Sequence, residues 1–259
     1  MSVRDRIARF RQSRKKFDYV FVVTYGRSGS TLVQGLLNTL PRTMVRGENN
    51  LYLLPFFEAE KLAREFKDEH ITHGAGNVIS AFYGLHDLRI VDFARNTGEF
   101  VTRQLLGRTD PDAVDTLGFK EVVWHRIAPE DTEEFFRFMD DAFPGARYVL
   151  NQRDHEAVAG SGFWQNFEQT EVHSAIARVE EIQEHLRKTR PDRVLDLRYE
   201  LLTSDDQAVS DAQLRSLAEF VTSSCDPSLL DALRETRSKG HGPNPFGKSR
   251  GRKRAPQPD

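Results

Sequence analysis

A short loop near the start of the chain contains the residue types that bind phosphate. Gly26 and Gly29 permit a tight turn and a close approach of the backbone to a ligand. Between them, Arg27 supplies a positive charge on a planar guanidinium group, whose geometry suits phosphate. The loop also contains hydroxyl groups that can donate to phosphate oxygens, those of Ser28, Ser30 and Thr31. These residues predict an anion-binding site over 26–31.

The segments around this loop predict a strand before it and a helix after it. Residues 17–24 are a near-continuous apolar run, typical of a strand buried on both faces of a parallel sheet. After the loop, leucines recur at four-residue spacing until Pro41, which is typical of a helix. Backbone N–H groups in such a turn, followed by the amino end of a helix, form a pocket for anions.

The rest of the chain alternates between predicted strands and helices. We expect further strands at 45–49, 117–123, 147–152 and 193–199. We expect helices over most of 50–106, with a glycine-rich break at 73–76, and at 129–142 and 165–188. This alternation predicts an α/β protein with three layers, α/β/α, around a central parallel sheet.

The composition indicates a globular domain with basic ends. Its 259 residues suffice for one large α/β domain, and a formal net charge of −2 does not indicate a nucleic-acid binder. The single cysteine, Cys225, excludes an internal disulfide and a cysteine-based metal cluster. No apolar run approaches the ~20 residues of a membrane span, and the amino terminus does not resemble a signal peptide. We expect a cytoplasmic protein with a basic lead-in (1–16), one domain (17–242) and a basic, disordered tail (243–259).

The loop differs from the common ATP- and GTP-binding pattern G-x-x-x-x-G-K-[ST], in which a lysine follows the second glycine. Here Ser30 follows Gly29, and the basic residue of the loop, Arg27, precedes it. The sequence therefore disfavours a conventional ATP or GTP site. A P-loop kinase or nucleotide-binding transferase stays as one alternative function, and a noncatalytic adaptor acting through the basic tail is another.

Residues 24–32, Thr-Tyr-Gly-Arg-Ser-Gly-Ser-Thr-Leu, resemble the 5′-phosphosulfate loop of the sulfotransferase family. The resemblance is to the bacterial branch that includes trehalose sulfotransferases and often has Pro-Arg-Ser-Gly-Ser-Thr, with Gly26 where the proline usually lies. It implies a P-loop-like fold and the donor 3′-phosphoadenosine 5′-phosphosulfate (PAPS), with no metal required. It also implies that Arg27 contacts the transferred group.

A second motif fits the same family, which binds the 3′-phosphate of the donor with an Arg after a strand and a Ser eight residues later. Arg153 follows the predicted strand 147–152, and Ser161 stands at the expected spacing. His155 and the pair Glu156-Ala157 depart from the family pattern. Later, Lys239 and Gly240 resemble a Lys-Gly loop that closes over the phosphate end of the donor, and residues 197–202 resemble a mostly structural Tyr-Glu-Leu segment.

The transfer reaction needs a base for the acceptor hydroxyl and cations for the leaving oxygen. We favour Glu48 as the base, because related enzymes often have a glutamate in this region; its other interpretations are a helix cap or an ion pair with Arg46. His86 and His125 are alternative bases. Lys120 matches a Gly-x-Lys pattern in bacterial relatives and would steady the leaving phosphate or the acceptor, unless it simply pairs with Glu121 or another nearby acid.

The resemblance implies a small-molecule acceptor with a hydroxyl group, such as a sugar or a glycolipid. Aromatic side chains stack well on sugars. Candidates for an acceptor pocket, or alternatively for the core, are Tyr52, Phe56, Phe57, Phe163 and Trp164. The sequence is compatible with a homodimer and does not fix the oligomeric state.

Overall fold

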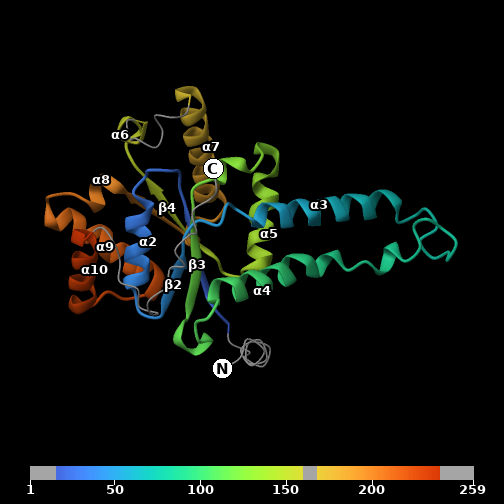
Figure 1. Ribbon diagram of the computed structural model, residues 1–259, viewed down its shortest axis with the longest axis horizontal. Helices are drawn as coiled ribbons and strands as arrows, with labels where there is room; N and C mark the ends of the chain where they lie inside the picture. Colours follow the sequence, from blue (N-terminus) through green and yellow to red (C-terminus); the bar gives the residue numbers. More distant parts are fainter. Residues whose placement is uncertain (1–15, 160–167, 240–259) are drawn as a thin grey trace, which may run out of the picture.

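A five-stranded parallel sheet forms the centre of the protein (Figure 1). The computed structural model describes residues 16–159 and 168–239. The strand order is β2-β3-β1-β4-β5. The strands are β1 (Asp18–Val23), β2 (Thr43–Arg46), β3 (Thr116–Glu121), β4 (Arg147–Gln152) and β5 (Val194–Arg198). The predicted α/β class is confirmed.

The order of the strands places a switch point at the carboxyl ends of β1 and β4. After β1 the chain crosses to β2 on one side of the sheet, whereas after β4 it crosses to β5 on the other side. β1 lies between β3 and β4, with Val22 beside Lys120 and Val23 beside Leu150. Ligands in open α/β sheets bind in the crevice at such a point.

Helices cover both faces of the sheet, because its side chains alternate between them. Val20 and Val22 of β1 pack under α2 (Ser30–Thr39), α9 (Gln207–Thr222) and α10 (Pro227–Lys239). Phe21 and Val23 pack on the opposite side, against α5 (Thr132–Ala142), α7 (Gln169–Thr189) and the neighbouring helices. The three layers are visible in Figure 1. Short connecting helices are η3 (Pro111–Ala113), η4 (Trp124–Arg126), η5 (Pro129–Asp131), α6 (His155–Ala159), η7 (Pro191–Arg193) and α8 (Tyr199–Leu202).

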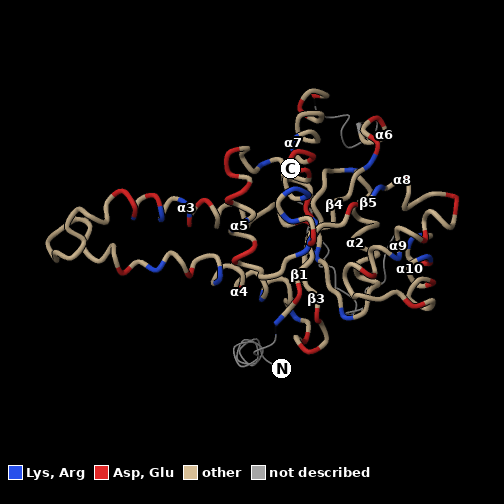
Figure 2. Tube along the Cα trace, turned by 180° about the vertical axis from the view of Figure 1, so that it is seen from behind, with Lys and Arg blue, Asp and Glu red and all other residues tan. Residues whose placement is uncertain are grey.

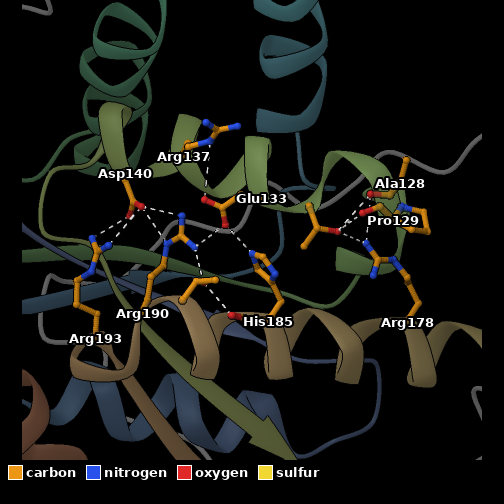
Figure 3. A network of polar contacts seen from close by, with 11 residues as sticks. Ala128, Pro129, Glu133, Arg137, Asp140, Arg178, His185, Arg190 and Arg193 are labelled. Atoms are coloured by element: carbon orange, nitrogen blue, oxygen red, sulfur yellow. Dashed lines mark hydrogen bonds and ion pairs between the residues drawn. The ribbon is translucent and has the colours of Figure 1, made fainter.

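A network of charged side chains joins α5 to the carboxyl end of α7 (Figure 3). The buried guanidinium of Arg190 lies 2.9 Å from Asp140 and 3.3 Å from Glu133. Arg193 also pairs with Asp140, at 2.9 Å, and His185 lies 2.8 Å from Glu133. Asp140 thus has two arginine partners, and Glu133 contacts Arg190, His185 and, within its own helix, Arg137 at 3.8 Å. The network fixes the two helices against each other.

Residues 53–106 form a helical hairpin that projects far from the sheet, and we call it the arm (Figure 1). It consists of α3 (Leu53–His70), η1 (Leu85–Asp87), η2 (Ile90–Asp92) and α4 (Phe93–Leu106). At its base, Phe57 packs edge-on against Phe135 and Phe138 of α5. Gly98 brings α4 close to α5, since a Cβ there would lie 1.9 Å from the Ala142 carbonyl oxygen. The predicted helices are confirmed, but the break between them spans 71–92 rather than 73–76.

None of the helices in the two described ranges combines the length and hydropathy that a membrane crossing requires. The first fifteen residues of the predicted lead-in, and the predicted tail, lie outside those ranges.

Candidate active site

The predicted anion-binding loop lies at the switch point, between β1 and the first turn of α2. Its backbone is left-handed at Arg27, with φ of 66°, and at Gly29, with φ of 81°. A Cβ at Gly29 would lie 2.1 Å from the Tyr199 ring. Glycine is therefore required both by the backbone conformation and by the close approach of this ring. The amino end of α2 faces the loop, and such helix ends attract anions.

Buried polar contacts hold the loop to the end of β4. The Thr24 hydroxyl oxygen lies 2.7 Å from both the Ser28 hydroxyl and the Asn151 carbonyl oxygen. The Asn151 side-chain amide donates to the Ser28 carbonyl at 2.9 Å. Ser28 is fully buried and Ser30 nearly so, whereas Arg27 and Thr31 are exposed. The Ser28 side chain thus stabilises the loop itself, and the exposed side chains are the ones free to meet a ligand.

Arg153 lies beside this loop, as the two sequence motifs together predicted. Its Nη1 donates to the Arg27 carbonyl at 3.1 Å, and its guanidinium lies 4.4 Å from the centre of the Tyr199 ring. Its Nε is buried without a hydrogen-bond partner among the described residues. A buried donor of this kind is costly unless a ligand or water satisfies it. Ser161, the second residue of this motif, lies outside the described residues.

Tyr25 fixes the end of β1 to the residue after β4. Its hydroxyl donates to the Arg153 carbonyl at 2.9 Å and accepts from the Arg153 N–H at 3.0 Å. Burial raises the pKa of this hydroxyl to about 12, so it keeps its proton and can donate at neutral pH. The loop and Arg153 are therefore held in a fixed relation to each other.

Tyr199 and Glu200 belong to the site, although the sequence indicated only a structural segment there. Tyr199 packs against Gly29 and under Arg153. Glu200 accepts the Asp154 backbone N–H at 2.9 Å and so holds the turn that follows Arg153. Both residues directly follow β5, at the same edge of the sheet as the loop. Their position directly after a strand was the sequence signal that could have placed them in the site, because the carboxyl ends of parallel strands lie at one edge of the sheet.

Glu48 and Lys120, the predicted base and its cationic neighbour, form an ion pair at the ends of β2 and β3. The Lys120 side chain is almost buried, whereas that of Glu48 is 51 % exposed. The two other interpretations of Glu48 are wrong. Arg46 donates to the Leu105 and Leu106 carbonyls instead of pairing with Glu48, and α3 begins only at Leu53, too far along the chain for Glu48 to cap it. The Lys120 ammonium fixes the position of the Glu48 carboxylate, which stays accessible from solvent.

Of the two ion pairs considered for Lys120, the one with a nearby acid is present, with Glu48, and the one with Glu121 is not. The Glu121 carboxylate is 1 % exposed and accepts four backbone N–H groups. Two of these, at 2.9 Å each, come from Asn49 and Leu51, directly after Glu48. Asn50 and Leu51 have left-handed backbones, with φ of 60° and 48°. Glu121 thus holds the strained turn that presents Glu48.

The two histidines considered as bases lie in different places. His125 follows β3 and is half-buried, close to Val123, which bridges to Tyr25. Burial, and secondly the charge of Arg126, lower the pKa of His125, and it lines a pocket of about 540 Å³ beside the start of α7. His86 lies at the far end of the arm, 3.3 Å from Asp87, and is not brought to the loop.

The structure places Lys239, predicted to lie near the phosphates of the donor, apart from the loop. Lys239 is the exposed last residue of α10 and pairs with Glu235. One turn earlier, Thr236 contacts Thr39, the last residue of α2, whereas the loop precedes the first residue of α2. Gly240 lies outside the described residues.

The aromatic candidates for an acceptor pocket divide into two groups. Phe57 is fully buried in the core. Tyr52 and Phe56 are half-buried and follow the turn that carries Glu48. Their rings pack edge-on, with their centres 6.4 Å apart. Phe163 and Trp164 lie outside the described residues. Within the described ranges, no three His, Cys, Asp or Glu residues are grouped as a metal site would need.

Comparison with known proteins identifies the family. Among the solved structures to which the chain is similar is a sulfotransferase domain from the Synechococcus PCC 7002 olefin synthase, with 18 % identity and a TM-score of 0.45 over 88 % of this chain and 94 % of that one. A sulfotransferase domain from the curacin biosynthetic pathway has 17 % identity and a TM-score of 0.43, over 84 % of this chain and 77 % of that one. The sulfotransferase STF1 from Mycobacterium tuberculosis H37Rv has 15 % identity and a TM-score of 0.41, over 91 % of this chain and 80 % of that one. No curated protein matches the sequence. The model of the sulfotransferase family matches residues 19–222, and the chain therefore belongs to the sulfotransferase family.

Proposed function

We propose that this protein transfers a sulfuryl group from PAPS to a hydroxyl group of a small-molecule acceptor. Family membership supports a sulfotransferase in general. The observation that carries the choice of donor is the contact between two anion-binding elements, the Gly26 loop and Arg153, whose Nη1 lies 3.1 Å from the Arg27 carbonyl. A donor with phosphates on both its 5′ and its 3′ oxygen needs two such elements side by side.

In this proposal the loop holds the 5′-phosphosulfate and Arg153 holds the 3′-phosphate. The loop contributes the backbone of residues 26–31, the amino end of α2 and the exposed Arg27 and Thr31 side chains. Arg153 contributes a guanidinium whose buried Nε has no partner among the described residues, which fits a group that binds an anion. Ser161 would add a hydroxyl to the 3′-phosphate site.

The chemistry is an in-line displacement at sulfur. The acceptor oxygen forms a bond to sulfur while the bond from sulfur to the 5′-phosphate oxygen breaks, leaving adenosine 3′,5′-bisphosphate. Glu48 takes the proton of the acceptor hydroxyl. Arg27 and Lys120 stabilise the negative charge that develops on the leaving oxygen. The half-exposed position of Glu48 gives an acceptor access to the carboxylate.

The acceptor is a hydroxylated molecule such as a sugar or glycolipid in this proposal. Tyr52 and Phe56 offer half-buried ring faces after the Glu48 turn. Such rings stack on the apolar faces of sugars. His125 stays as the alternative base, since it is half-buried at the same edge of the sheet.

The donor assignment is tested by calorimetric titration with adenosine 3′,5′-bisphosphate, adenosine 5′-monophosphate, and ATP with magnesium. We expect the bisphosphate to bind most tightly. Arg153→Ala should weaken it at least tenfold, roughly the loss of one charge-assisted hydrogen bond, and leave the monophosphate unchanged. Arg147→Ala, at the other end of β4, is the matched control. Tighter binding of ATP than of the bisphosphate would contradict the proposal and favour a kinase.

The base is tested with Glu48→Gln, which keeps the size of the side chain and removes its capacity as a base. We expect sulfuryl transfer to fall at least a hundredfold while the affinity for the bisphosphate stays unchanged. Glu58→Gln, an exposed glutamate on α3, serves as the control. If Glu48→Gln transferred at the normal rate and His125→Gln did not, His125 would be the base.

A further inference from the structure

The arm exposes most of the large apolar side chains that reach the surface of the described protein. Eleven such side chains are exposed, and nine of them lie between residues 62 and 100. They are Leu62, Phe66, Ile71, Val78, Ile79, Tyr83, Leu88, Val91 and Phe100. Scattered single apolar residues are normal on a protein surface, but a concentration of this kind marks an interaction site.

The exposed apolar groups follow the length of the arm and are not confined to its tip. Leu62 and Phe66 lie one turn apart on α3, with 68 % and 47 % of their surface exposed. Val78 and Ile79 lie in the connection between the helices, and Phe100 lies within α4. An 18-residue helix such as α3 is about 27 Å long. A partner that covers all these groups must lie alongside the arm, whereas a flat membrane meeting the tip would leave the helices uncovered.

The area of this surface agrees with a stable protein interface. With exposed fractions from 37 % to 87 %, nine side chains of this size present on the order of 900 Å². A stable complex buries roughly 800 Å² on each partner.

The charges of the arm argue against a polyanionic partner. Residues 53–106 contain eight acidic and six basic residues, which gives a net charge of −2 with neutral histidines. The tip is almost free of charge, as the tan tube at the far end of the arm shows in Figure 2. Nucleic acids and acidic membranes attract surfaces with an excess of lysine and arginine, which the arm lacks.

The exposed charges of the arm are acidic on α3 and of both signs on the segment that returns from the tip. The exposed charged residues of α3 are all acidic: Glu58, Glu65, Asp68 and Glu69. The basic residues of α3 are turned inward, since Lys61 and Arg64 pair with α5 or the helix before it, and Lys67 donates to carbonyls of the tip. On the segment that returns from the tip, Arg89 and Arg95 have side chains that are 76 % and 64 % exposed, and both pair with Asp92. Asp87 and Glu99 of the same segment are also exposed, by 80 % and 58 %.

These features fit a second copy of the same chain. In a two-fold symmetric pair, the same surface of both copies forms the interface. A contact between α3 of one copy and α4 of the other therefore occurs twice. Two arms lying antiparallel would place the acidic side of α3 against Arg89 and Arg95 of the partner copy, and apolar side chains of the two arms against each other. We propose that the arm is a dimerisation element and that two copies associate through their arms as an antiparallel helical bundle. The proposal does not depend on the identity of the donor or the acceptor.

The first test measures mass in solution by sedimentation equilibrium at micromolar concentrations. We expect the full chain, of 29.7 kDa, to sediment with twice that mass. Leu62→Asp and Ile79→Asp should weaken association at least tenfold, because each buries a charge in the interface. Leu201→Asp, which alters an exposed leucine away from the arm, should leave it unchanged. Circular dichroism checks that each variant is folded.

The second test reverses the charges on one helix at a time. Glu58→Lys with Glu65→Lys places positive charge on α3, and Arg89→Glu with Arg95→Glu places negative charge beside α4. We expect each double variant alone to be monomeric, and an equal mixture of the two to form a heterodimer, since both helix contacts are then complementary.

A monomeric wild-type protein at tens of micromolar would overturn the proposal. So would a dimer that Leu62→Asp leaves intact, or charge-reversed variants that do not associate when mixed. Binding to vesicles of neutral phospholipid by a monomeric wild-type protein, lost in Ile79→Asp, would assign the arm to a lipid surface instead.

Discussion

The carboxyl edge of the sheet and the arm differ in how they accommodate side chains in unfavourable surroundings: the edge buries a carboxylate, and the arm exposes apolar groups to solvent. At the edge, a carboxylate as costly to bury as that of Glu121 is enclosed and accepts four backbone N–H groups within its own chain. On the arm, apolar groups such as Ile79, 87 % exposed, have no such cover from residues 16–159 and 168–239. The edge is organised by the chain itself, whereas the arm, in our proposal, is covered by a second copy. The same kind of substitution should therefore have very different effects in the two regions.

The largest difference is expected between two glutamates. Glu121→Gln replaces an acceptor oxygen by an NH2 group that would face backbone N–H donors. We expect it to lower the free energy of unfolding by about 3 kcal/mol, measured by urea denaturation. Glu69→Gln, on the exposed side of α3, should change it by no more than about 0.5 kcal/mol.

Glu121→Gln also tests whether this residue positions Glu48. Because Glu121 holds the Asn49 and Leu51 backbone, its loss should slow sulfuryl transfer while the affinity for adenosine 3′,5′-bisphosphate is kept. Equal stability of the two glutamine variants would contradict the contrast between edge and arm.

A smaller difference is expected between two glycines. Gly29→Ala puts a Cβ 2.1 Å from the Tyr199 ring at a residue with φ of 81°, so we expect about 2 kcal/mol of destabilisation and at least tenfold weaker bisphosphate binding. Gly76→Ala, on the arm, meets no atom within 4 Å and should be neutral or stabilising by up to about 1 kcal/mol. Thermal unfolding and calorimetry measure both. Unchanged binding by Gly29→Ala would show that the loop tolerates a side chain.

The smallest effect concerns pH and His125. Burial, then Arg126, lower the pKa of His125 below its usual 6.5, so the unfolded chain takes up this proton more readily than the folded protein. Stability should therefore fall as the pH drops below about 6.5. Between about pH 7.5 and 5.5 we expect the wild-type protein to lose up to about 1 kcal/mol more than His125→Gln does. Equal losses in urea denaturation would show that burial does not affect this histidine.

The sequence was sufficient where local patterns decide the structure. The apolar run at 17–24, the glycine loop and the leucine spacing predicted a strand, an anion-binding turn and a helix, and all three are present. The approach of Arg153 to the loop also followed, because β1 and β4 are parallel and their carboxyl ends meet at one edge. Glu48 and Lys120 lie together for the same reason, at the ends of β2 and β3.

The sequence was insufficient where a contact depends on packing between distant elements. Lys120 and Glu121 looked like partners because they are adjacent, yet consecutive strand residues point to opposite faces. Tyr199 looked structural because nothing in its own segment reveals that its ring lies against Gly29. The projection of the arm away from the sheet was likewise not predicted, since an apolar spacing predicts a helix without showing what that helix packs against.

The arm is also the crossover that joins two neighbouring parallel strands, β2 and β3. A connection of this type requires only a dozen or so residues, whereas this chain uses all of 47–115. The surplus is folded outward as a hairpin and adds nothing to the register of the strands. Substitutions on the exposed surface of the arm can therefore change what the protein associates with and leave the pairing of β2 with β3 intact.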